Sequence, residues 1–182
     1  MIHASRLTKI YGDASSGIKA IDGLNLKIES GQRVALLGRS GSGKTTLMNI
    51  LAGLDRPTSG ELIAAGKSLF ELSPAEIAHY RQTCVGVVFQ SFQLINHRTA
   101  AQNVELPLIL SGVNAANRKQ RVDECLERVA IAHRRNHIPA QMSGGEQQRV
   151  ANARAIVSKP PLLWPMNQRA TSTRKPPTGS PS

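Results

Sequence analysis

The sequence GRSGSGKTT at residues 38–46 decides the fold of this chain. It begins with a glycine, and Gly43, Lys44 and Thr45 follow at the spacing of a phosphate-binding P-loop. Glycines let the backbone curl around a phosphate without Cβ clashes, and the following helix directs its positive end at the anion. An apolar run at 34–37 precedes the loop, as the strand of such a motif should. The sequence therefore predicts a strand, a nucleotide-binding loop and a helix in this order.

The side chains of the loop have expected roles. Lys44 is placed to reach the β- and γ-phosphates, and Thr45 to offer its hydroxyl to Mg²⁺. The predicted nucleotide contacts in the loop are Gly38, Arg39, Ser40, Gly41, Ser42, Gly43, Lys44, Thr45 and Thr46. The apolar face expected to pack the helix on a sheet is Leu47, Ile50, Leu51 and Leu54. A glycine-rich turn with a chance lysine is the alternative interpretation, and the position of the loop between strand and helix disfavours it.

Length and composition favour one cytoplasmic domain. The 182 residues are enough for one packed interior. Apolar stretches such as 106–110 are too short to cross a bilayer, and the first residues lack the apolar segment of a signal peptide. Cys84 and Cys125 have no paired spacing and no histidine at metal-ligand distance. We interpret them as reduced, packed thiols.

The net charge of +11 raises the question of nucleic-acid binding. The basic residues are spread along the chain, and the densest cluster, at 133–137, has no interleaved aromatic residue. A solvated basic face is therefore favoured over a nucleic-acid site, and no specific nucleic-acid partner is expected.

The N-terminal half combines strands with a helix. Alternating apolar and polar residues at 2–11 and 24–28 predict antiparallel strands, and 61–66 predicts another short strand. Ser73 with Glu76 three residues later forms a capping-box pattern, which predicts a helix beginning there.

Two residues at strand ends are candidate ligand contacts. Tyr11 closes the first strand, where its ring could stack on a purine base, although a simple strand-end tyrosine fits the spacing equally well. The β-branched run at 85–89 predicts a strand buried on both faces, and Gln90 follows it. Open α/β sheets bind ligands at the carboxyl ends of their strands. Gln90 is therefore a candidate for contacting Mg²⁺ or the attacking water, with a turn residue as the alternative.

The pattern from 91 to 141 is helical and lacks strand signals. Pro107 and Gly112 are expected to interrupt its first part, and an amphipathic helix is expected to begin near Asn114. We interpret this segment as an all-helical insertion between two parts of an α/β core.

A second candidate anion site follows this segment. Residues 142–149 read MSGGEQQR and open a helix. Ser143 is a suitable N-cap, and Gly144 and Gly145 leave the N–H groups at the helix start unobstructed. A capped helix start is common by itself, but its combination with a P-loop in one chain is specific.

These motifs resemble the ATP-binding subunit of ABC transporters. The matching pieces are Tyr11, the loop at 38–46, Gln90 and the SGGE motif at 143–146, in family order within residues 1–163. Three further runs are similar to the subunits that serve lipoprotein-release, macrolide-efflux and cell-division permeases. These runs are 85–92, 103–108 and 144–151.

The resemblance implies an α/β fold: a P-loop NTPase core with an antiparallel β subdomain and an inserted α-helical subdomain. It implies ATP and Mg²⁺ as cofactors, Tyr11 against the adenine, and Lys44 and Gln90 at the reacting phosphate. It also implies a head-to-tail dimer in which Ser143 and the two glycines after it clamp the γ-phosphate held by the partner subunit. A membrane permease would dock on the helical insertion, at the inner face of the cell membrane.

The family pattern also requires a buried strand that ends in Asp-Glu. Leu162 and Leu163 begin that strand, but WPMNQR follows at 164–169, and the sequence has no acidic residue after Glu146. When the codons for 164–173 are read from the third base of the tryptophan codon, they permit Ala-Asp-Glu-Pro-Thr-Gly-Asn-Leu-Asp. We therefore hypothesise that one nucleotide was lost near this junction.

Three functional hypotheses follow from the missing carboxylates. The first is a C-terminally truncated ABC subunit with an incomplete domain at 1–163, a disordered, frameshifted tail at 164–182 and little or no hydrolysis. The second is a nucleotide-binding remnant without turnover. The third is a soluble ABC ATPase acting on nucleic acid, which the positive charge alone favours.

Overall fold

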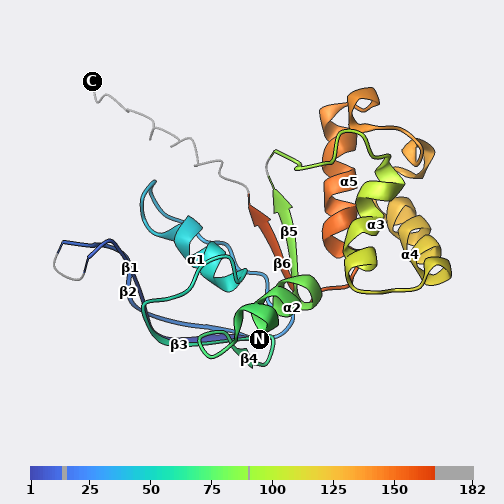
Figure 1. Cartoon of the computed structure of the whole chain (residues 1–182). Helices are drawn as coiled ribbons and strands as arrows, with labels where there is room; N and C mark the ends of the chain where they lie inside the picture. Colours follow the sequence, from blue (N-terminus) through green and yellow to red (C-terminus); the bar gives the residue numbers. More distant parts are fainter. Residues whose placement is uncertain (14–15, 90, 167–182) are drawn as a thin grey trace, which may run out of the picture.

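The structure, a computed structural model, describes residues 1–13, 16–89 and 91–166. Four strands form an antiparallel sheet in the order β2-β1-β3-β4 (Figure 1). They are β1 (Ile2–Tyr11), β2 (Ile18–Ile28), β3 (Ser59–Ala64) and β4 (Lys67–Ser68). The strands expected in these regions are confirmed, and β2 begins earlier than its alternation predicts.

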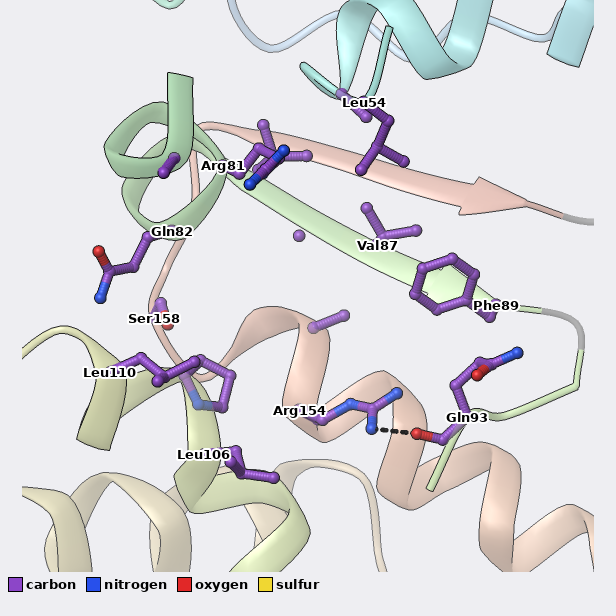
Figure 2. A pocket seen from close by; sticks show the side chains of 16 residues that line it. Leu54, Arg81, Gln82, Val87, Phe89, Gln93, Leu106, Leu110, Arg154 and Ser158 are labelled. Atoms are coloured by element: carbon purple, nitrogen blue, oxygen red, sulfur yellow. Dashed lines mark hydrogen bonds between the residues drawn. The ribbon is translucent and has the colours of Figure 1, made fainter. Parts of the chain in front are cut away.

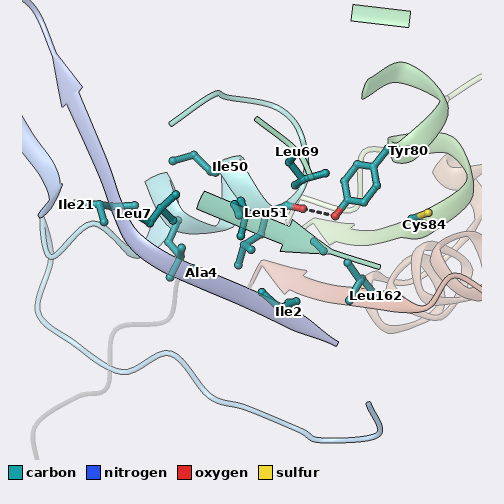
Figure 3. Close-up of a cluster of buried hydrophobic side chains, with 13 residues drawn as sticks. Ile2, Ala4, Leu7, Ile21, Ile50, Leu51, Leu69, Tyr80, Cys84 and Leu162 are labelled. Atoms are coloured by element: carbon teal, nitrogen blue, oxygen red, sulfur yellow. Dashed lines mark hydrogen bonds between the residues drawn. The ribbon is translucent and has the colours of Figure 1, made fainter. Parts of the chain in front are cut away.

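The first hydrophobic core lies between this sheet and two helices, α1 (Lys44–Leu51) and α2 (Pro74–Cys84) (Figure 3). The hydroxyl of Tyr80 in α2 donates to the Leu51 carbonyl oxygen at 2.8 Å, which links the two helices inside the core. The expected capping box at the start of α2 is confirmed. The expected apolar face of α1 is wrong in one place, because α1 ends before Leu54 and that side chain is 52% exposed.

A separate two-stranded parallel sheet lies beside this core. It pairs β5 (Val85–Phe89) with β6 (Leu162–Met166), with Val85 opposite Leu162. The strand at 85–89 is confirmed, but its expected burial on both faces is wrong. Only Gly86 is fully buried, because β5 has one strand neighbour among the described residues. A Cβ at Gly86 would lie 2.2 Å from the carbonyl oxygen of Ala155 in helix α5 (Gly144–Ile156), so the close approach of this helix requires a glycine there.

The strand expected at 34–37 does not form. These residues have no regular secondary structure, and the Leu37 side chain is 82% exposed. A strand is stabilised by hydrogen bonds to a neighbouring strand, and no described strand pairs with this segment. Leu36 alone packs against the first core. The apolar pattern of the segment is therefore not sufficient to make it a strand.

Three helices form a second core apart from the sheets (Figure 1). They are α3 (Ala100–Leu110), α4 (Ala115–Arg128) and α5 (Gly144–Ile156), with short 3₁₀ turns at Ala132–Arg134 and Pro139–Gln141. The predicted start of a helix near Asn114 is confirmed, because Asn114 is the N-cap of α4. The expected interruption at Pro107 is wrong, since this residue lies inside α3. We call these three helices and the turns between them the helical cluster.

The described part of the chain ends with β6. Trp164 and the two residues after it continue this strand, so the expected tail boundary falls inside a strand. The rest of that tail, 167–182, lies outside the described residues. Cys84 and Cys125 are buried and form no disulfide. Within the described ranges, no helix is both long and apolar enough to cross a membrane.

Candidate functional site

The loop at 38–46 joins α1 at the position that its sequence predicts. Lys44 is the first residue of α1, and Gly43 is its N-cap with a φ of 80°. A Cβ on Gly43 would lie 2.2 Å from the carbonyl oxygen of Ala20 in β2. This position therefore requires glycine for two reasons, the left-handed backbone and the contact with the sheet.

The side chain of Lys44 lies inside the loop. Its Nζ donates to the carbonyl oxygens of Gly38 and Arg39, both at 2.7 Å, and contacts the Ser42 hydroxyl at 3.1 Å. The carbonyl groups thus hold the ammonium group where the loop would curl around an anion. The loop itself therefore positions Lys44, the side chain that the sequence predicts to contact the phosphates.

The loop borders a hollow of about 360 Å³. Residues of β2, the segment before the loop and the start of α1 line it, among them Asp22, Leu36, Gly38 and Lys44. Thr45, the candidate ligand of Mg²⁺ in the loop, is exposed on the first turn of α1. Among the described residues, no three His, Cys, Asp or Glu side chains form a metal-binding group. Gln90, the other candidate ligand of Mg²⁺, lies outside the described residues.

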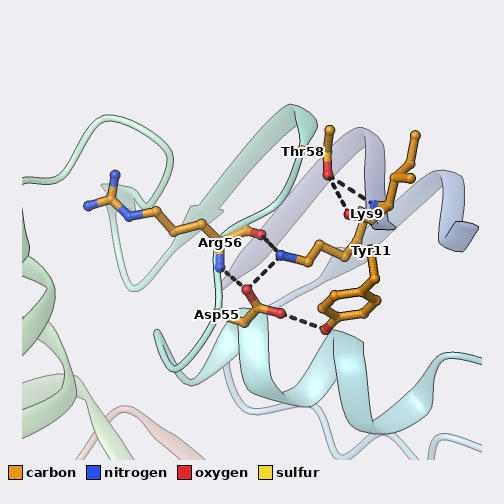
Figure 4. A network of polar contacts seen from close by, with 6 residues as sticks. Lys9, Tyr11, Asp55, Arg56 and Thr58 are labelled. Atoms are coloured by element: carbon orange, nitrogen blue, oxygen red, sulfur yellow. Dashed lines mark hydrogen bonds and ion pairs between the residues drawn. The ribbon is translucent and has the colours of Figure 1, made fainter. Parts of the chain in front are cut away.

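Tyr11 lies at the end of β1, next to the helix that follows the loop (Figure 4). Its hydroxyl donates to Asp55 Oδ2 at 2.6 Å, and its side chain remains accessible, with the residue 43% exposed. The hydrogen bond to Asp55 is the main reason that the pKa of Tyr11 is raised. Burial alone would raise the pKa of Asp55, but hydrogen bonds from Lys9 and Tyr11 outweigh it and lower that pKa. Sequence reasoning missed Asp55, which is 44 positions from Tyr11.

The SGGE motif begins α5, as its sequence predicts. The Ser143 hydroxyl accepts from the Glu146 N–H at 3.3 Å, and the Glu146 carboxylate accepts from the Ser143 N–H at 2.7 Å. Gly144 and Gly145 are exposed, and a Cβ on either would have nothing within 4 Å. The glycines therefore leave the helix start open to an approaching anion.

Arg134 and His133 lie beside the Glu146 carboxylate. Arg134 Nε donates to Glu146 Oε1 at 2.8 Å, and His133 Nε2 lies 3.7 Å from the same oxygen. Hydrogen bonds from the Ser143 N–H, which is the largest cause, and from Arg134 lower the pKa of Glu146 to about 2. Arg135 pairs with Asp123. The basic cluster, expected to be a solvated face, is thus partly paired with carboxylates.

The loop and the SGGE motif do not meet within one chain. Figure 1 shows α1 and α5 on opposite sides of the two-stranded sheet, with α1 beside the antiparallel sheet and α5 in the helical cluster. The two candidate anion sites are therefore separate in this chain.

An apolar groove of about 650 Å³ lies between the two-stranded sheet and the helical cluster (Figure 2). Leu54, Val87, Phe89 and Leu110 are among its apolar lining residues. Arg154 of α5 lies at its base, where its guanidinium donates to the Gln93 and Phe92 carbonyl oxygens at 2.6 and 2.8 Å. Burial lowers the pKa of this arginine. We call this feature the apolar groove.

The family model described as ABC transporter matches residues 21–164 of this chain. The chain belongs to the ABC transporter family. It is of the ATP-binding type, as its motifs predict. The chain is 44% identical over 164 residues to the uncharacterized ABC transporter ATP-binding protein MJ1508 of Methanocaldococcus jannaschii. This match covers 90% of the chain and 73% of that protein.

Two other matches agree with this assignment. The lipoprotein-releasing system ATP-binding protein LolD of Geobacter metallireducens is 42% identical, over 90% of the chain and 72% of LolD. The dimeric ABC transporter cassette MJ0796 is 40% identical, with a TM-score of 0.80 over 91% of the chain and 73% of the cassette. A structure of the same cassette in a post-hydrolysis state contains ADP and Pi. The predicted family and fold are confirmed.

Proposed function

We propose that this chain is the subunit of an ABC transporter that binds ATP with Mg²⁺ at the loop 38–46. The observation that carries the proposal is the position of Lys44, which the loop carbonyls hold at the start of α1. An ammonium group and unpaired helix N–H groups at one place favour a polyphosphate. The ADP and Pi in the MJ0796 structure support the same ligand class.

The individual roles follow from this placement. Lys44 would contact the β- and γ-phosphates, Thr45 would bind Mg²⁺, and Tyr11 would stack on the adenine. The amides of the glycine-rich loop would hold the remaining phosphate oxygens. Gln90 would contact Mg²⁺ or the attacking water.

A head-to-tail dimer would bring the two anion sites together. Ser143, Gly144 and Gly145 lie away from the loop of their own chain but are exposed at a helix start. In a dimer of this kind, they would meet the γ-phosphate bound by the partner subunit. The dimeric state of MJ0796 supports this arrangement.

The permease would dock at the apolar groove, between the two-stranded sheet and the helical cluster. Apolar lining residues such as Leu106 and Leu110 would take an apolar helix of the permease, which would hold the chain at the inner face of the membrane. Leu110→Glu should reduce recovery of the chain with membranes, because it places a charge in the groove. Ile18→Glu, at an exposed site in β2 that is not part of the groove lining, is the matched control. Equal recovery of the two variants would contradict this docking site.

Hydrolysis is expected to be lost in this chain. The sequence has no acidic residue after Glu146, so no carboxylate follows β6 to hold the Mg²⁺ shell or act as a general base. Removal of a general base alone typically lowers the rate by ~10²–10⁴-fold. The family match ends at residue 164, where the hypothesised frameshift begins. We therefore propose an incomplete ABC domain at 1–163, with a helical insertion at about 91–141, which binds ATP without turnover.

The experiment that tests ATP binding is an equilibrium titration of the chain and its Lys44→Ala variant. Charge-assisted hydrogen bonds contribute about 1.5–3 kcal/mol, so the variant should bind ATP about tenfold to hundredfold more weakly. Lys27→Ala, which removes an exposed lysine of β2, is the matched control and should bind as the parent chain does. Unchanged affinity in Lys44→Ala would contradict the proposal.

A nucleic-acid-directed ATPase is the weaker candidate. In the densest basic cluster, Arg134 pairs with Glu146 and Arg135 pairs with Asp123. These pairs leave less free positive charge for a phosphate backbone.

A further inference from the structure

A network of polar contacts connects Tyr11 to the turn that follows α1 (Figure 4). Asp55 is its centre. One carboxylate oxygen accepts from the Tyr11 hydroxyl at 2.6 Å, and the other accepts from Lys9 Nζ at 2.6 Å. The second oxygen also accepts from the Arg56 N–H at 2.7 Å. Lys9 and the Arg56 N–H therefore hold the carboxylate in place, and the carboxylate in turn holds the Tyr11 hydroxyl.

The network fixes the Tyr11 ring at both of its ends. Its Cβ belongs to β1, and its hydroxyl is held by Asp55. A ring held only by its backbone changes side-chain rotamer readily, whereas a ring anchored at its hydroxyl does not. The orientation of this ring is therefore determined by Asp55.

Lys9 covers one face of the ring. Its ammonium nitrogen lies over the Tyr11 ring, 4.7 Å from the centroid, in cation–π geometry. The Lys9 side chain is only 13% exposed, and its ammonium group also donates to the Arg56 carbonyl oxygen at 2.8 Å. A planar group that stacks on Tyr11 must therefore use the opposite face.

Helix α1 connects the Tyr11 ring to the phosphate-binding loop. The loop ends where α1 begins at Lys44, and the N–H groups of Leu54 and Asp55 donate to the Asn49 carbonyl oxygen at the other end. Because these bonds join the turn to α1, the helix fixes the distance between loop and ring. An elongated ligand with a phosphate end and an aromatic end would match such a pair of sites.

We propose that Asp55 is a positioning residue for nucleobase binding, which with Lys9 holds Tyr11 as a stacking surface open on one face only. This inference rests on the proposed function, since it needs a nucleotide whose phosphates bind at the loop. Asp55 acts through Tyr11 and does not contact the phosphates. It therefore affects ligands that carry a base and leaves a bare polyphosphate unaffected.

The test compares two probes, ATP and inorganic tripolyphosphate, by equilibrium titration of the full chain. Asp55→Ala should weaken ATP binding about threefold to tenfold, the effect expected for one lost hydrogen bond and a less ordered ring. Tripolyphosphate affinity should stay within about twofold of the parent value, because that probe has no base. Glu29→Gln, at an exposed carboxylate that pairs with Lys27, is the matched control and should change neither affinity.

Two further variants separate positioning from a structural role. Tyr11→Phe keeps the ring but removes the hydroxyl, so Asp55→Ala should add less than about twofold to its effect on ATP. Asp55→Asn keeps an oxygen that can accept from Tyr11, so it should recover most of the affinity lost in Asp55→Ala. If Asp55→Ala does not fold, the Asp55→Asn and Tyr11→Phe variants still report on the same hydrogen bond.

The outcomes distinguish this inference from the proposed function. Equal losses for ATP and tripolyphosphate in Asp55→Ala would overturn the positioning role, as would an unchanged affinity for ATP. Full additivity of Tyr11→Phe and Asp55→Ala would also overturn it. If Lys44→Ala weakens neither probe, the proposed function itself fails.

Discussion

The part of the chain that contains the loop 38–46 and the helical cluster differ in how their elements are stabilised. In the helical cluster, α3, α4 and α5 have side-chain caps and share a buried core. In the part with the loop, α1 has no side-chain cap, and the segment 34–37 has no strand neighbour among the described residues. Helices, whose hydrogen bonds are local, therefore form wherever the local sequence favours them. Strands form only where a partner strand is present.

The largest expected effect compares apolar side chains in the two regions. Leu126 in the helical cluster is 1% exposed, whereas Leu37 beside the loop is 82% exposed. Leu126→Ala should lower the free energy of unfolding by about 2–5 kcal/mol, because it leaves a cavity. Leu37→Ala should change it by no more than about 0.5 kcal/mol. Urea unfolding of both variants checks this, and equal losses would show that residues 34–37 are packed as a strand after all.

A smaller effect compares glycines in the two anion-binding motifs. Gly43→Ala should destabilise the chain by about 1–3 kcal/mol, because it combines a φ of 80° with a contact 2.2 Å from the Ala20 oxygen. Gly144→Ala should stay within about 0.5 kcal/mol, since a Cβ there meets nothing within 4 Å. Thermal unfolding distinguishes them. A large loss for Gly144→Ala would mean that the helix start in the SGGE motif is more constrained than its geometry indicates.

The smallest expected effect concerns the pH dependence of the Glu146 contacts. The pKa of Glu146 in the folded chain is about 2, below its ordinary value. A lowered folded pKa contributes stability above the unfolded pKa, near 4.3, and that contribution disappears as the pH falls toward 2. The stability difference between the parent chain and Glu146→Gln should therefore shrink between about pH 4.5 and pH 2. A difference that stays constant across this window would show that the Glu146 charge contributes nothing.

Local patterns predicted much of the fold and of the candidate site. The caps at Ser73, Asn114 and Ser143 and the start of α1 at Lys44 all lie within a few residues of the signals that predict them. The loop at 38–46 follows the same rule, because glycine conformation and helix start are local properties.

The remaining features depend on residues that are distant in sequence. The failure of 34–37 to form a strand and the partial burial of β5 depend on which described strands lie beside them. The bond between Tyr11 and Asp55 spans 44 positions, and the pair of Arg134 with Glu146 joins a turn to a helix start. No periodicity or spacing in the sequence indicates such contacts. Pro107 shows another limit, because it lies inside α3 despite the low helix propensity of proline.

We propose that this chain keeps the ATP-binding loop of an ABC ATPase but lacks the carboxylates that hydrolysis needs. The most direct test measures ATP binding and phosphate release on one preparation of the chain, with Lys44→Ala as the reference. We predict saturable ATP binding that depends on Lys44, with phosphate release no faster than in the Lys44→Ala variant. Phosphate release that depends on Lys44 would contradict the claim, and so would ATP binding that does not depend on it.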